Sequence, residues 1–561
     1  GYGMDFKRRI ADNLPVEGFD VYANLSAPTD SRMGDYCLPC FRLSKTLKKA
    51  PQAIAEELKN AFAAEGIAAE TAGGYLNFRI DRATKARAVL TENFARGEEF
   101  APAPGNGRTI TVDYSSINIA KPFHIGHLLT TAIGGSLCRI FRQLGYNVVG
   151  INHLGDWGTQ FGKLIAAYLK WGDESDVEAR GIHALLELYV RFHKEAETDP
   201  SLEDEGRRWF KAIEDGDSFA LGIFERFKAV TLRDVEKVYK RLGIRFDSYA
   251  GESFYNDKMQ PIIDELAQKG LLTDSEGAKV VDLDAYGMPP CLILKSDGAT
   301  LYATRDLAAA CYRHDTYRFY KNLYVVAYQQ TLHFRQVFKV LELMGRTWAG
   351  DCVHVPFGMV SLEGSGALST RSGNVVFLED VLNTAVGKAE KIIEEKSPDL
   401  SDKAATAEAV GVGAVLFMAL STARIKDLVF SFDKALNFDG ETGPYLQYTY
   451  ARAASVMRKC GTAADADADF SLLTDDGSDA VITELNRFDE VVADAAEKYE
   501  PSILSRYLID LAQSFNRFYI DHRIAGEAPP VTRARLLLTD CVRRTLKNGM
   551  RLILLTAPER M

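Results

Sequence analysis

A chain of 561 residues with 47% hydrophobic and 26% charged residues is long enough for several domains and has the composition of a soluble globular protein. We find no apolar run long enough to span a membrane and no secretory pattern at the N-terminus. Eight cysteines are too few in a chain of this length to indicate a disulfide scaffold, so we expect the protein to reside in a reducing cytoplasm. The net charge of −10 disfavours a protein that coats nucleic acid by bulk charge, but it permits a local basic surface.

The first hundred residues predict a small α/β domain, which we place at residues 4–100. A helix is expected near Ala53–Ala64, and a Gly-Gly turn separates it from a short strand at Tyr75–Ile80. The stretch APAPGNG at 101–107 has no periodicity and is rich in Pro and Gly, so it marks a domain boundary.

The segment Thr109–Thr130, TITVDYSSINIAKPFHIGHLLT, predicts a strand, a polar loop and a helix. Its β-branched start predicts the strand, with Asp113 at the carboxyl end. An apolar helix begins near His124-Ile125-Gly126-His127, where free N–H groups and the positive end of the helix dipole form an anion site. Gly126 leaves room for a flat ring to approach the backbone.

Two patterns raise the question of a metal. His124 and His127 could be half of a metal site, or could be satisfied by local hydrogen bonds, and Cys37 and Cys40 have the spacing of a zinc or redox pair. Neither pair is followed by a second cluster with ligand spacing. We therefore expect no metal held by protein side chains.

The whole string resembles the first signature of class I aminoacyl-tRNA synthetases, and its flanks resemble the arginyl-tRNA synthetase family. That family usually reads Ser-Ser-Pro-Asn before Ile-Ala-Lys-Pro. Here Ile117 replaces the proline, which predicts a less rigid loop, while Asn118 is retained. The resemblance implies an arginine–tRNA ligase, an ATP-dependent enzyme that makes arginyl-adenylate and transfers arginine to tRNA in protein synthesis.

Further strands are expected on both sides of a long helical stretch. Tyr146–Ile151 predicts the second strand, and the polar, Gly-rich segment that follows it fits the ligand crevice of an open α/β sheet. His153 in that segment is as well explained by a structural role as by a chemical one. Cys291–Lys295 and Leu323–Ala327 predict strands of the second half of the nucleotide fold.

Residues from about 160 to 290 predict a helical insertion. Apolar residues recur at three- and four-residue spacing over Ile182–His193 and Phe219–Leu242. Class I synthetases carry an insertion between the two halves of their nucleotide fold, and a helical one argues against an editing domain.

Recognition of a guanidinium requires a planar carboxylate, and Asp113 and Asp306 are the candidates. Without the resemblance, a structural ion pair with Arg305 or Arg313 would explain the Asp306 carboxylate equally well. The resemblance implies a set of arginine-binding positions in this chain. These are Asp113, Ser116, Asn118, His124, Tyr302, Asp306 and Gln330.

The Gly-rich stretch 354–374 resembles a weakened second class I signature, although by itself it reads as an ordinary surface loop. Both signature lysines are absent, and the resemblance implies that Lys121 compensates. The implied catalytic residues are Lys121, His124, His127 and Arg371. The implied ATP-binding residues are His124, Gly126, His127, Met359, Ser369 and Thr370. Mg²⁺ is expected to ride on the ATP phosphates, with no tightly bound cofactor.

Residues 376–561 predict an all-helical domain that resembles the anticodon-binding domain of the family. Tyr445 and Tyr448 are candidates to stack on unpaired bases, with Tyr450 beside them and with Arg452 and Arg458 nearby, although most aromatic residues at helical spacing are core. We expect Tyr445, Tyr448 and Arg452 to contact tRNA. Thr462–Asp479 is expected to be a solvated acidic loop.

The fold class is therefore α/β, with a Rossmann-like parallel-sheet catalytic domain at 108–375 between the N-terminal domain and the helical C-terminal domain. The N-terminal domain of the family contacts the outer corner of tRNA, and Lys45, Lys48 and Lys49 could contact phosphates or simply belong to a solvated helix face. The expected partners are tRNA, L-arginine and ATP, for a cytoplasmic monomer without membrane association. Two alternatives remain open: a tRNA-free nucleotidyltransferase and a catalytically silent tRNA-binding relative.

Overall fold

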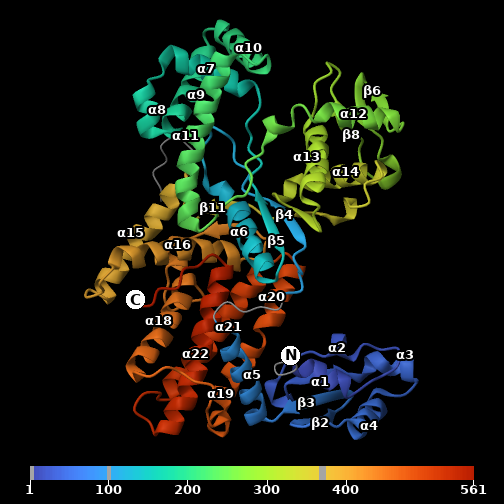
Figure 1. Cartoon of the computed structure of the whole chain (residues 1–561), viewed down its shortest axis with the longest axis vertical. Helices are drawn as coiled ribbons and strands as arrows, with labels where there is room; N and C mark the ends of the chain where they lie inside the picture. Colours follow the sequence, from blue (N-terminus) through green and yellow to red (C-terminus); the bar gives the residue numbers. More distant parts are fainter. Residues whose placement is uncertain (1–4, 98–102, 365–374) are drawn as a thin grey trace.

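The computed structural model describes residues 5–97, 103–364 and 375–561, and Figure 1 shows their arrangement. A four-stranded parallel sheet with strand order β10-β9-β4-β5 lies at its centre. The strands are β4 (Thr109–Asp113), β5 (Asn147–Ile151), β9 (Lys321–Val325) and β10 (Cys352–Val355). Helix α6 (Leu128–Gln143) follows β4 and is almost wholly buried. The predicted α/β catalytic fold is confirmed.

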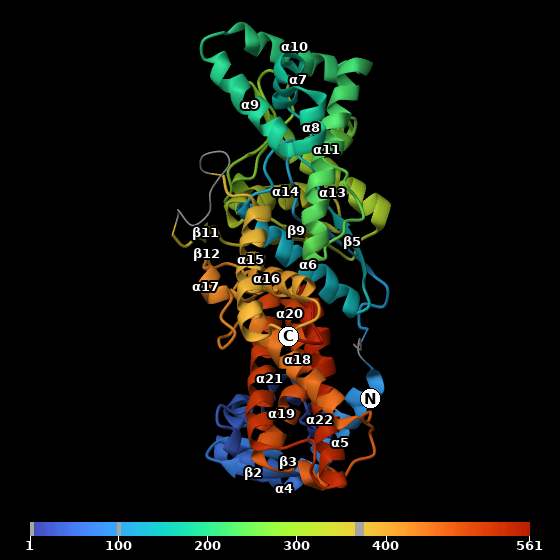
Figure 2. The ribbon, with the colours of Figure 1, turned by 90° about the vertical axis from the view of Figure 1, so that its left-hand side faces the viewer.

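The helical insertion forms its own lobe at one end of the molecule (Figure 2). Its helices are α7 (Thr159–Trp171), α8 (Glu174–Arg180), α9 (Ile182–Ala196), α10 (Ser201–Glu214) and α11 (Ser218–Leu242). Asp217 caps the start of α11 through the Ala220 N–H, and Gly243 ends it in the left-handed conformation that glycine tolerates. Both helices predicted from apolar spacing in this region are confirmed.

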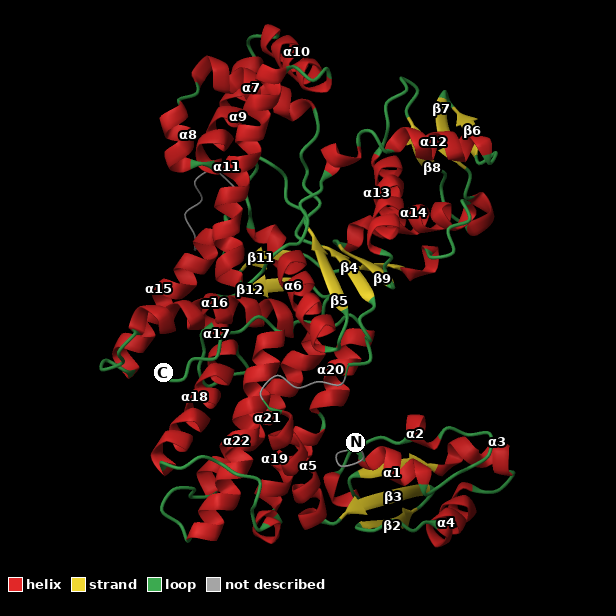
Figure 3. Ribbon diagram, viewed as in Figure 1, coloured by secondary structure: helices red, strands yellow, loops and turns green. Residues whose placement is uncertain are grey.

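A second lobe follows in the chain and has a separate hydrophobic core. Figure 3 shows its strands. It contains α12 (Met259–Gln268), β6 (Leu272–Ser275), β7 (Ala278–Val281), β8 (Cys291–Leu294), α13 (Tyr302–Tyr317) and α14 (Thr331–Leu343). The three strands form an antiparallel sheet. The expectation that residues 160 to about 290 are mostly helical therefore holds as far as α12 and fails at β6 and β7. The strand predicted at Cys291–Lys295 is present, but it belongs to the antiparallel sheet and not to the parallel one. The prediction failed because a short apolar run is typical of strands in both kinds of sheet.

The N-terminal module packs helices on a three-stranded antiparallel sheet of order β1-β3-β2. Its elements are α1 (Phe6–Asp12), α2 (Val21–Asn24), β1 (Tyr36–Pro39), α3 (Ser44–Leu47), α4 (Pro51–Ala61), β2 (Ile67–Ala72) and β3 (Tyr75–Ile80). The predicted helix and strand are both present. Cys37 and Cys40 are buried free thiols, and burial raises the pKa of Cys40 to about 11, so an inert structural role holds.

The C-terminal part is a helical bundle. Its helices are α15 (Leu378–Lys396), α16 (Lys403–Ser421), α17 (Phe432–Ala435), α18 (Gly443–Cys460), α19 (Asp476–Asn486), α20 (Phe488–Glu497), α21 (Pro501–Asp521) and α22 (Pro529–Leu552). One exception to the all-helical expectation is β12 (Leu428–Phe430), which pairs in parallel with β11 (Val360–Leu362).

Helix α16 is long and apolar enough to cross a membrane by composition, contrary to the expectation that no such run exists. Most of its residues are buried, and it packs against α15, α18 and α21. A helix that is apolar on all sides is typical of a protein core as well as of a membrane. Its packing shows that α16 is the central helix of this bundle.

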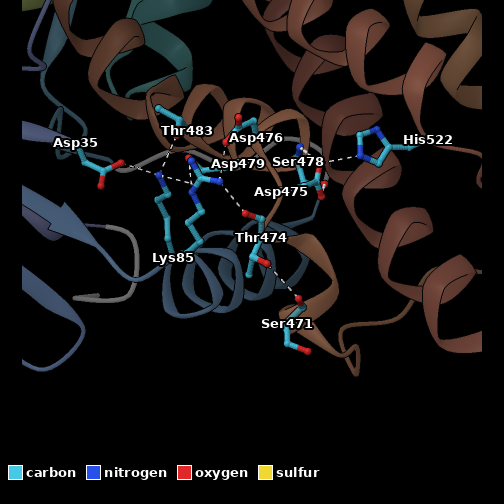
Figure 4. Close-up of polar contacts among 11 residues, drawn as sticks. Asp35, Lys85, Ser471, Thr474, Asp475, Asp476, Ser478, Asp479, Thr483 and His522 are labelled. Carbon is cyan, nitrogen blue, oxygen red and sulfur yellow. Dashed lines mark hydrogen bonds and ion pairs between the residues drawn. The ribbon is translucent and has the colours of Figure 1, made fainter. Parts of the chain in front are cut away.

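A buried lysine joins the N-terminal module to the C-terminal bundle (Figure 4). Lys85 lies on α5 (Arg82–Arg96), and its side chain is 2% exposed. Its Nζ lies 2.6 Å from Asp35 Oδ1 in the module and 2.9 Å from Asp479 Oδ1 in the bundle, and it donates to Thr483 Oγ1 at 3.0 Å. A buried cation with three polar partners fixes the two parts in one relative position.

The predicted acidic loop Thr462–Asp479 is only partly solvated. Arg82 Nη1 lies 2.9 Å from Asp476 Oδ1, and His522 Nε2 lies 2.6 Å from Asp475 Oδ2 (Figure 4). Phe470 and Leu473 of the same stretch are buried in the core. The expectation failed because the cations that pair with these carboxylates come from distant parts of the chain.

Candidate active site

Polar residues follow all four strands of the parallel sheet. Asp113 ends β4, His153 lies two residues after β5, the one-turn helix Tyr328–Gln330 follows β9, and Met359 lies four residues after β10. In open α/β sheets, ligands bind in the crevice beyond the carboxyl ends of the strands. The predicted arginine and ATP residues within the described ranges gather at this edge.

His124 and His127 hold each other in a reciprocal cap at the start of α6. The Gly126 N–H donates to His124 Nδ1 at 3.0 Å, and the His124 N–H donates to His127 Nδ1 at 3.3 Å. The two ring centroids are 4.2 Å apart. The Nδ1 atoms of both histidines are therefore satisfied by local hydrogen bonds, which was one of the two alternatives. No group of side chains that could hold a metal ion occurs among the described residues.

This cap also fixes the protonation of both rings. Burial lowers the pKa of His124, and burial together with His124 lowers the pKa of His127 to about 4. Both rings are therefore neutral near pH 7. Because each Nδ1 accepts a backbone hydrogen bond, each neutral ring carries its proton on Nε2. The site thus presents two N–H donors beside the free N–H groups of the helix start.

Gly126 is required by the His124 ring. A Cβ at position 126 would lie 2.5 Å from His124 Cε1 and 2.7 Å from Nδ1. The sequence attributed this glycine to close approach of a ligand ring, but its nearest neighbour is the histidine. A side chain here would displace the His124 imidazole.

The loop between β4 and α6 is held by the insertion. The Ser115 hydroxyl lies 2.6 Å from Tyr239 Oη, and the Ala120 N–H donates to Thr231 Oγ1 at 3.0 Å, so both contacts come from α11. The buried Ile117 donates its N–H to Asn152 Oδ1 at 3.3 Å, a bond that proline could not make. The loss of proline is thus compensated by a tertiary hydrogen bond.

Asp113 already has a cation of its own. Arg313 Nη1 lies 2.9 Å from Asp113 Oδ2, and the Ser116 hydroxyl donates to Asp113 Oδ1 at 2.7 Å. Arg313 is 1% exposed and Asp113 is also buried. The ion pair that the sequence allowed between Arg313 and Asp306 is therefore made with Asp113 instead.

Asp306 lies on the same face of α13, two turns before Arg313, and is bound by His333. His333 Nε2 lies 2.5 Å from Asp306 Oδ2. The hydrogen bond from His333, followed by the charges of His333, His153 and Arg313, outweighs burial and lowers the pKa of Asp306. The Asp306 carboxylate is therefore ionised and partly buried, with His153 and Arg313 close to it. Arg305 is not its partner, because Arg305 donates to the Glu252 carbonyl and to Asn256 Oδ1.

A third carboxyl group lies beside this pair. Glu252 is half-buried, and burial raises its pKa to about 7, helped by the like charges of Asp156 and Asp306 and opposed by Arg305. A Cβ placed on Gly155 would lie 1.9 Å from Asn118 Oδ1 and 3.2 Å from Glu252 Oε1, so Gly155 lets these two side chains meet. His153 is close to both Asp113 and Asp306, with a buried Nδ1 that has no hydrogen-bond partner in the described structure.

The remaining predicted residues form the rim of the crevice. Tyr302 is 74% exposed, one turn before Asp306, and Gln330, Lys121 and Met359 are also exposed. Gln329 Nε2 lies 2.9 Å from Met359 Sδ. Ser369, Thr370 and Arg371 lie outside the described residues. The chain after them returns to the site, since the Ile125 N–H donates to the Val376 carbonyl at 2.9 Å.

Sequence reasoning missed the partners of the site carboxylates. His333 lay within the segment most similar to the family, but it received no role, and Arg313 appeared only as an alternative partner for Asp306. Glu252 lies in a one-turn helix (Glu252–Tyr255) without any local pattern that signals a site. Only spatial proximity identifies it.

A basic, aromatic pocket of about 530 Å³ lies on the C-terminal bundle, beside the chain end. Arg452 lies over the rings of Tyr448 and Tyr519, at 5.2 and 4.5 Å from their centroids, and Arg458 and Lys459 also line it. Tyr445 is half-buried, and its hydroxyl accepts from Asn516 at 2.9 Å. Tyr450 is fully buried and donates to Glu559, so the expectation that it could stack on a base is wrong.

A parallel sheet with a His-Ile-Gly-His helix start, interrupted by a helical insertion and followed by a helical bundle, defines a class I aminoacyl-tRNA synthetase. The sequence matches the family model described as tRNA synthetases class I (R), catalytic domain, over residues 89–432. It also matches the arginyl tRNA synthetase N terminal domain over residues 5–80 and the DALR anticodon binding domain over residues 446–561.

Full-length relatives agree. The arginine–tRNA ligase of Alkaliphilus metalliredigens is 50% identical over 565 residues, which is 99% of this chain and all of the relative. That of Halothermothrix orenii is 48% identical over the full length of both chains. The structure of Thermus thermophilus arginyl-tRNA synthetase matches with a TM-score of 0.85 at 29% identity, over 99% of each chain. The chain belongs to the arginyl-tRNA synthetase family, the arginine–tRNA ligases of class I.

Proposed function

We propose that this enzyme activates L-arginine with ATP at the crevice beyond the parallel sheet and then transfers arginine to its tRNA. The observation that carries the proposal is the position of the His124–His127 cap and the Asp306–His333 pair at the same sheet edge. The first offers N–H donors to phosphates, and the second offers a carboxylate to a cation. ATP chemistry and guanidinium recognition are thus neighbours.

Asp306 is the main partner of the substrate guanidinium. Its ionised state and fixed orientation favour two parallel hydrogen bonds to a planar cation. Asp113 forms an ion pair with Arg313, and it supports the site by orienting Ser116. Asn118, Gln330 and the exposed Tyr302 contact the rest of the amino acid. A lysine substrate would leave part of the Asp306 carboxylate unpaired, which accounts for specificity without editing.

No side-chain nucleophile is needed, because the substrate carboxylate attacks the α-phosphorus of ATP. The enzyme contributes orientation and stabilises charge as it develops on the phosphates. His124 and His127 donate through Nε2–H, Gly126 leaves room for the His124 ring, and the exposed Lys121 supplies the cation that the second signature lacks. Mg²⁺ arrives with the ATP phosphates, which are its preferred ligands.

We propose that Met359 and the signature segment with Ser369, Thr370 and Arg371 take part in ATP binding, as the resemblance implies. Support comes from the chain on each side of that segment: β11 precedes it, and Val376 and Phe377 then return to the signature helix. Arg371 stands one position after the second absent lysine, and it acts on the leaving pyrophosphate.

The pocket around Tyr448 and Arg452 binds unpaired bases of the tRNA. An exposed tyrosine ring under a guanidinium is a stacking platform that any base can use. Tyr445 contributes the inner wall, since its hydroxyl is already bonded to Asn516. The N-terminal module adds contacts through exposed Lys45 and Lys48.

We further propose a cytoplasmic monomer, without membrane association, in three domains at residues 4–100, 108–375 and 376–561. Eight free cysteines, most of them buried, suit a reducing compartment.

The decisive experiment is ATP–pyrophosphate exchange with arginine in the presence of tRNA. Exchange that depends on arginine supports the proposal, and its absence favours the silent tRNA-binding alternative. A gel shift with tRNA separates the enzyme from a tRNA-free nucleotidyltransferase, which would show none.

A further inference from the structure

A basic pocket of about 390 Å³ lies away from the crevice, at the other end of α6. Four cations line it: Arg139 and Arg142 from the last turns of α6, Lys240 from the end of α11, and Arg245 just after it. With a rise of about 1.5 Å per residue, the 16 residues of α6 separate this pocket from His127 by roughly 20 Å. The basic pocket is therefore distinct from the proposed active site.

The basic pocket has little negative charge to balance these cations. Within the described ranges, Arg142 has one carboxylate in reach, Asp247 at 3.7 Å, and neither Lys240 nor Arg245 forms an ion pair or a side-chain hydrogen bond. The chain as a whole carries a net charge of −10. With four cations and one carboxylate, the basic pocket is positively charged, although the chain as a whole is negative.

Arg139 gives the basic pocket a fixed cation. Its Nη1 donates to the Arg551 carbonyl and its Nη2 to the Gly243 carbonyl, both at 2.7 Å. Burial, followed by the neighbouring charges of Arg551 and Arg142, lowers the pKa of Arg139. Two neutral carbonyls position this guanidinium without neutralising it, so an anion entering the basic pocket would relieve repulsion that is already present.

The basic pocket lies where three parts of the protein meet. Arg139 ties the end of α11 to the end of α22, and the Ser136 hydroxyl donates to the Leu552 carbonyl at 2.7 Å. Figures 1 and 2 show the lower end of α11 beside α6, above the C-terminal bundle. A tRNA that reached from the C-terminal bundle to the proposed active site would pass from one of these parts to the next.

We propose that the basic pocket binds a phosphate group, and that the sugar–phosphate backbone of tRNA supplies it. Two exposed, unpaired cations above a fixed arginine match the way proteins neutralise backbone phosphates without reading sequence. This contact extends the proposed function, but it does not depend on the residues assigned to arginine or ATP.

The test uses the full chain with the double substitution K240Q/R245Q. Both side chains are exposed and unpaired in the described structure, so folding should persist, which thermal unfolding would check. The control is K279Q/K295Q, which removes two exposed charges, one in β7, where Lys279 pairs with Asp274, and one just after β8. The charge reversal K240E/R245E should enlarge any effect.

The dissociation constant for tRNA is measured between about 50 and 200 mM salt. We expect K240Q/R245Q to weaken binding about tenfold at the lowest salt and to reduce the slope of log affinity against log salt by about 1 to 2. The control should change neither quantity. The Michaelis constants for ATP and arginine at saturating tRNA should stay the same.

A second arm measures protection against thermal unfolding by tripolyphosphate, with the ATP site saturated by ATP. Loss of that protection in K240Q/R245Q with unchanged tRNA binding would keep the phosphate site and assign it to a free phosphate. If neither tRNA affinity nor tripolyphosphate protection changes, the proposal is overturned. Because these variants leave Asp306 and His127 intact, failure here is separate from failure of the proposed function.

Discussion

Arg313 Nη1 lies 2.9 Å from Asp113 Oδ2, in the interior beneath the proposed arginine site. One of the two carboxylates that the sequence offered to the substrate is thus already paired with an arginine of the protein itself. The other, Asp306, is bound by the imidazole of His333. Because of this difference, we assign a structural role to Asp113 and propose Asp306 as the carboxylate that binds the substrate.

The Asp113–Arg313 pair should behave as a structural ion pair. Arg313→Met leaves a buried carboxylate without a cation, so we expect a loss of about 3–5 kcal/mol in the free energy of unfolding. Adding Asp113→Asn should recover part of that loss, because the uncompensated charge disappears. Denaturant unfolding of the two variants measures both effects. Independent, additive losses would contradict the pairing.

Asp306→Asn should abolish arginine activation while the fold persists. The neutral amide has one acceptor oxygen and no charge, so it cannot form two parallel hydrogen bonds with a guanidinium, and we expect kcat/KM for arginine to fall at least about a hundredfold. The matched control is Asp315→Asn on the same helix, where the side chain is exposed. ATP–pyrophosphate exchange gives the measurement. Unchanged arginine kinetics would refute the assignment.

His127→Ala should lower turnover far more than it weakens ATP binding. The Nε2–H donor is expected to act mainly on charge that develops in the transition state, so kcat should fall about 10²- to 10³-fold. Steady-state kinetics in ATP separates kcat from KM. Exposed His193→Ala is the control. Equal losses in kcat and in ATP affinity would count against a transition-state role.

The Michaelis constant for arginine should depend on pH through Glu252. Its pKa is raised to about 7, and a bound cation would lower it, so arginine binding releases a proton. The constant should therefore fall about tenfold from pH 6 to pH 8, if binding lowers that pKa by two units or more. Glu252→Gln should remove most of this dependence. A profile identical to that of the unchanged enzyme would exclude Glu252 as the titrating group.

The same group also predicts the direction of a stability change. The pKa of Glu252 is higher in the folded than in the unfolded chain, so the folded state holds the extra proton between about pH 4.5 and 7. Its contribution to the free energy of unfolding thus decreases as pH rises through that window. Glu252→Gln should raise the melting temperature at pH 8 relative to the unchanged protein, and less so at pH 5.

Lys85→Met should loosen the N-terminal module from the bundle. The substitution leaves Asp35 and Asp479 facing each other without their shared cation. We expect a loss of about 3–5 kcal/mol in stability, or a separate early unfolding step of the module. Calorimetry distinguishes the two. Lys45→Met, at an exposed position of the same module, should unfold like the unchanged chain.

Local patterns were sufficient for much of the fold. We could predict α9 and α11 from the spacing of their apolar residues, and β4 from its β-branched start. These patterns involve only residues that are near one another in the sequence, so they can be recognised without the tertiary structure. Where short apolar runs were involved, as at β8, periodicity could not distinguish a strand of the parallel sheet from one of a separate antiparallel sheet.

The sequence by itself determined the chemistry available to this protein: a helix start that carries two histidines, a carboxylate, Asp113, at the end of a predicted strand, and a second candidate carboxylate, Asp306, far along the chain. Only the tertiary structure decided which charge meets which. Asp113 received Arg313, Asp306 received His333, and Lys85 received both Asp35 and Asp479. The physical reason is that an ion pair depends on distances of a few ångströms between residues far apart in the chain, which no local spacing encodes.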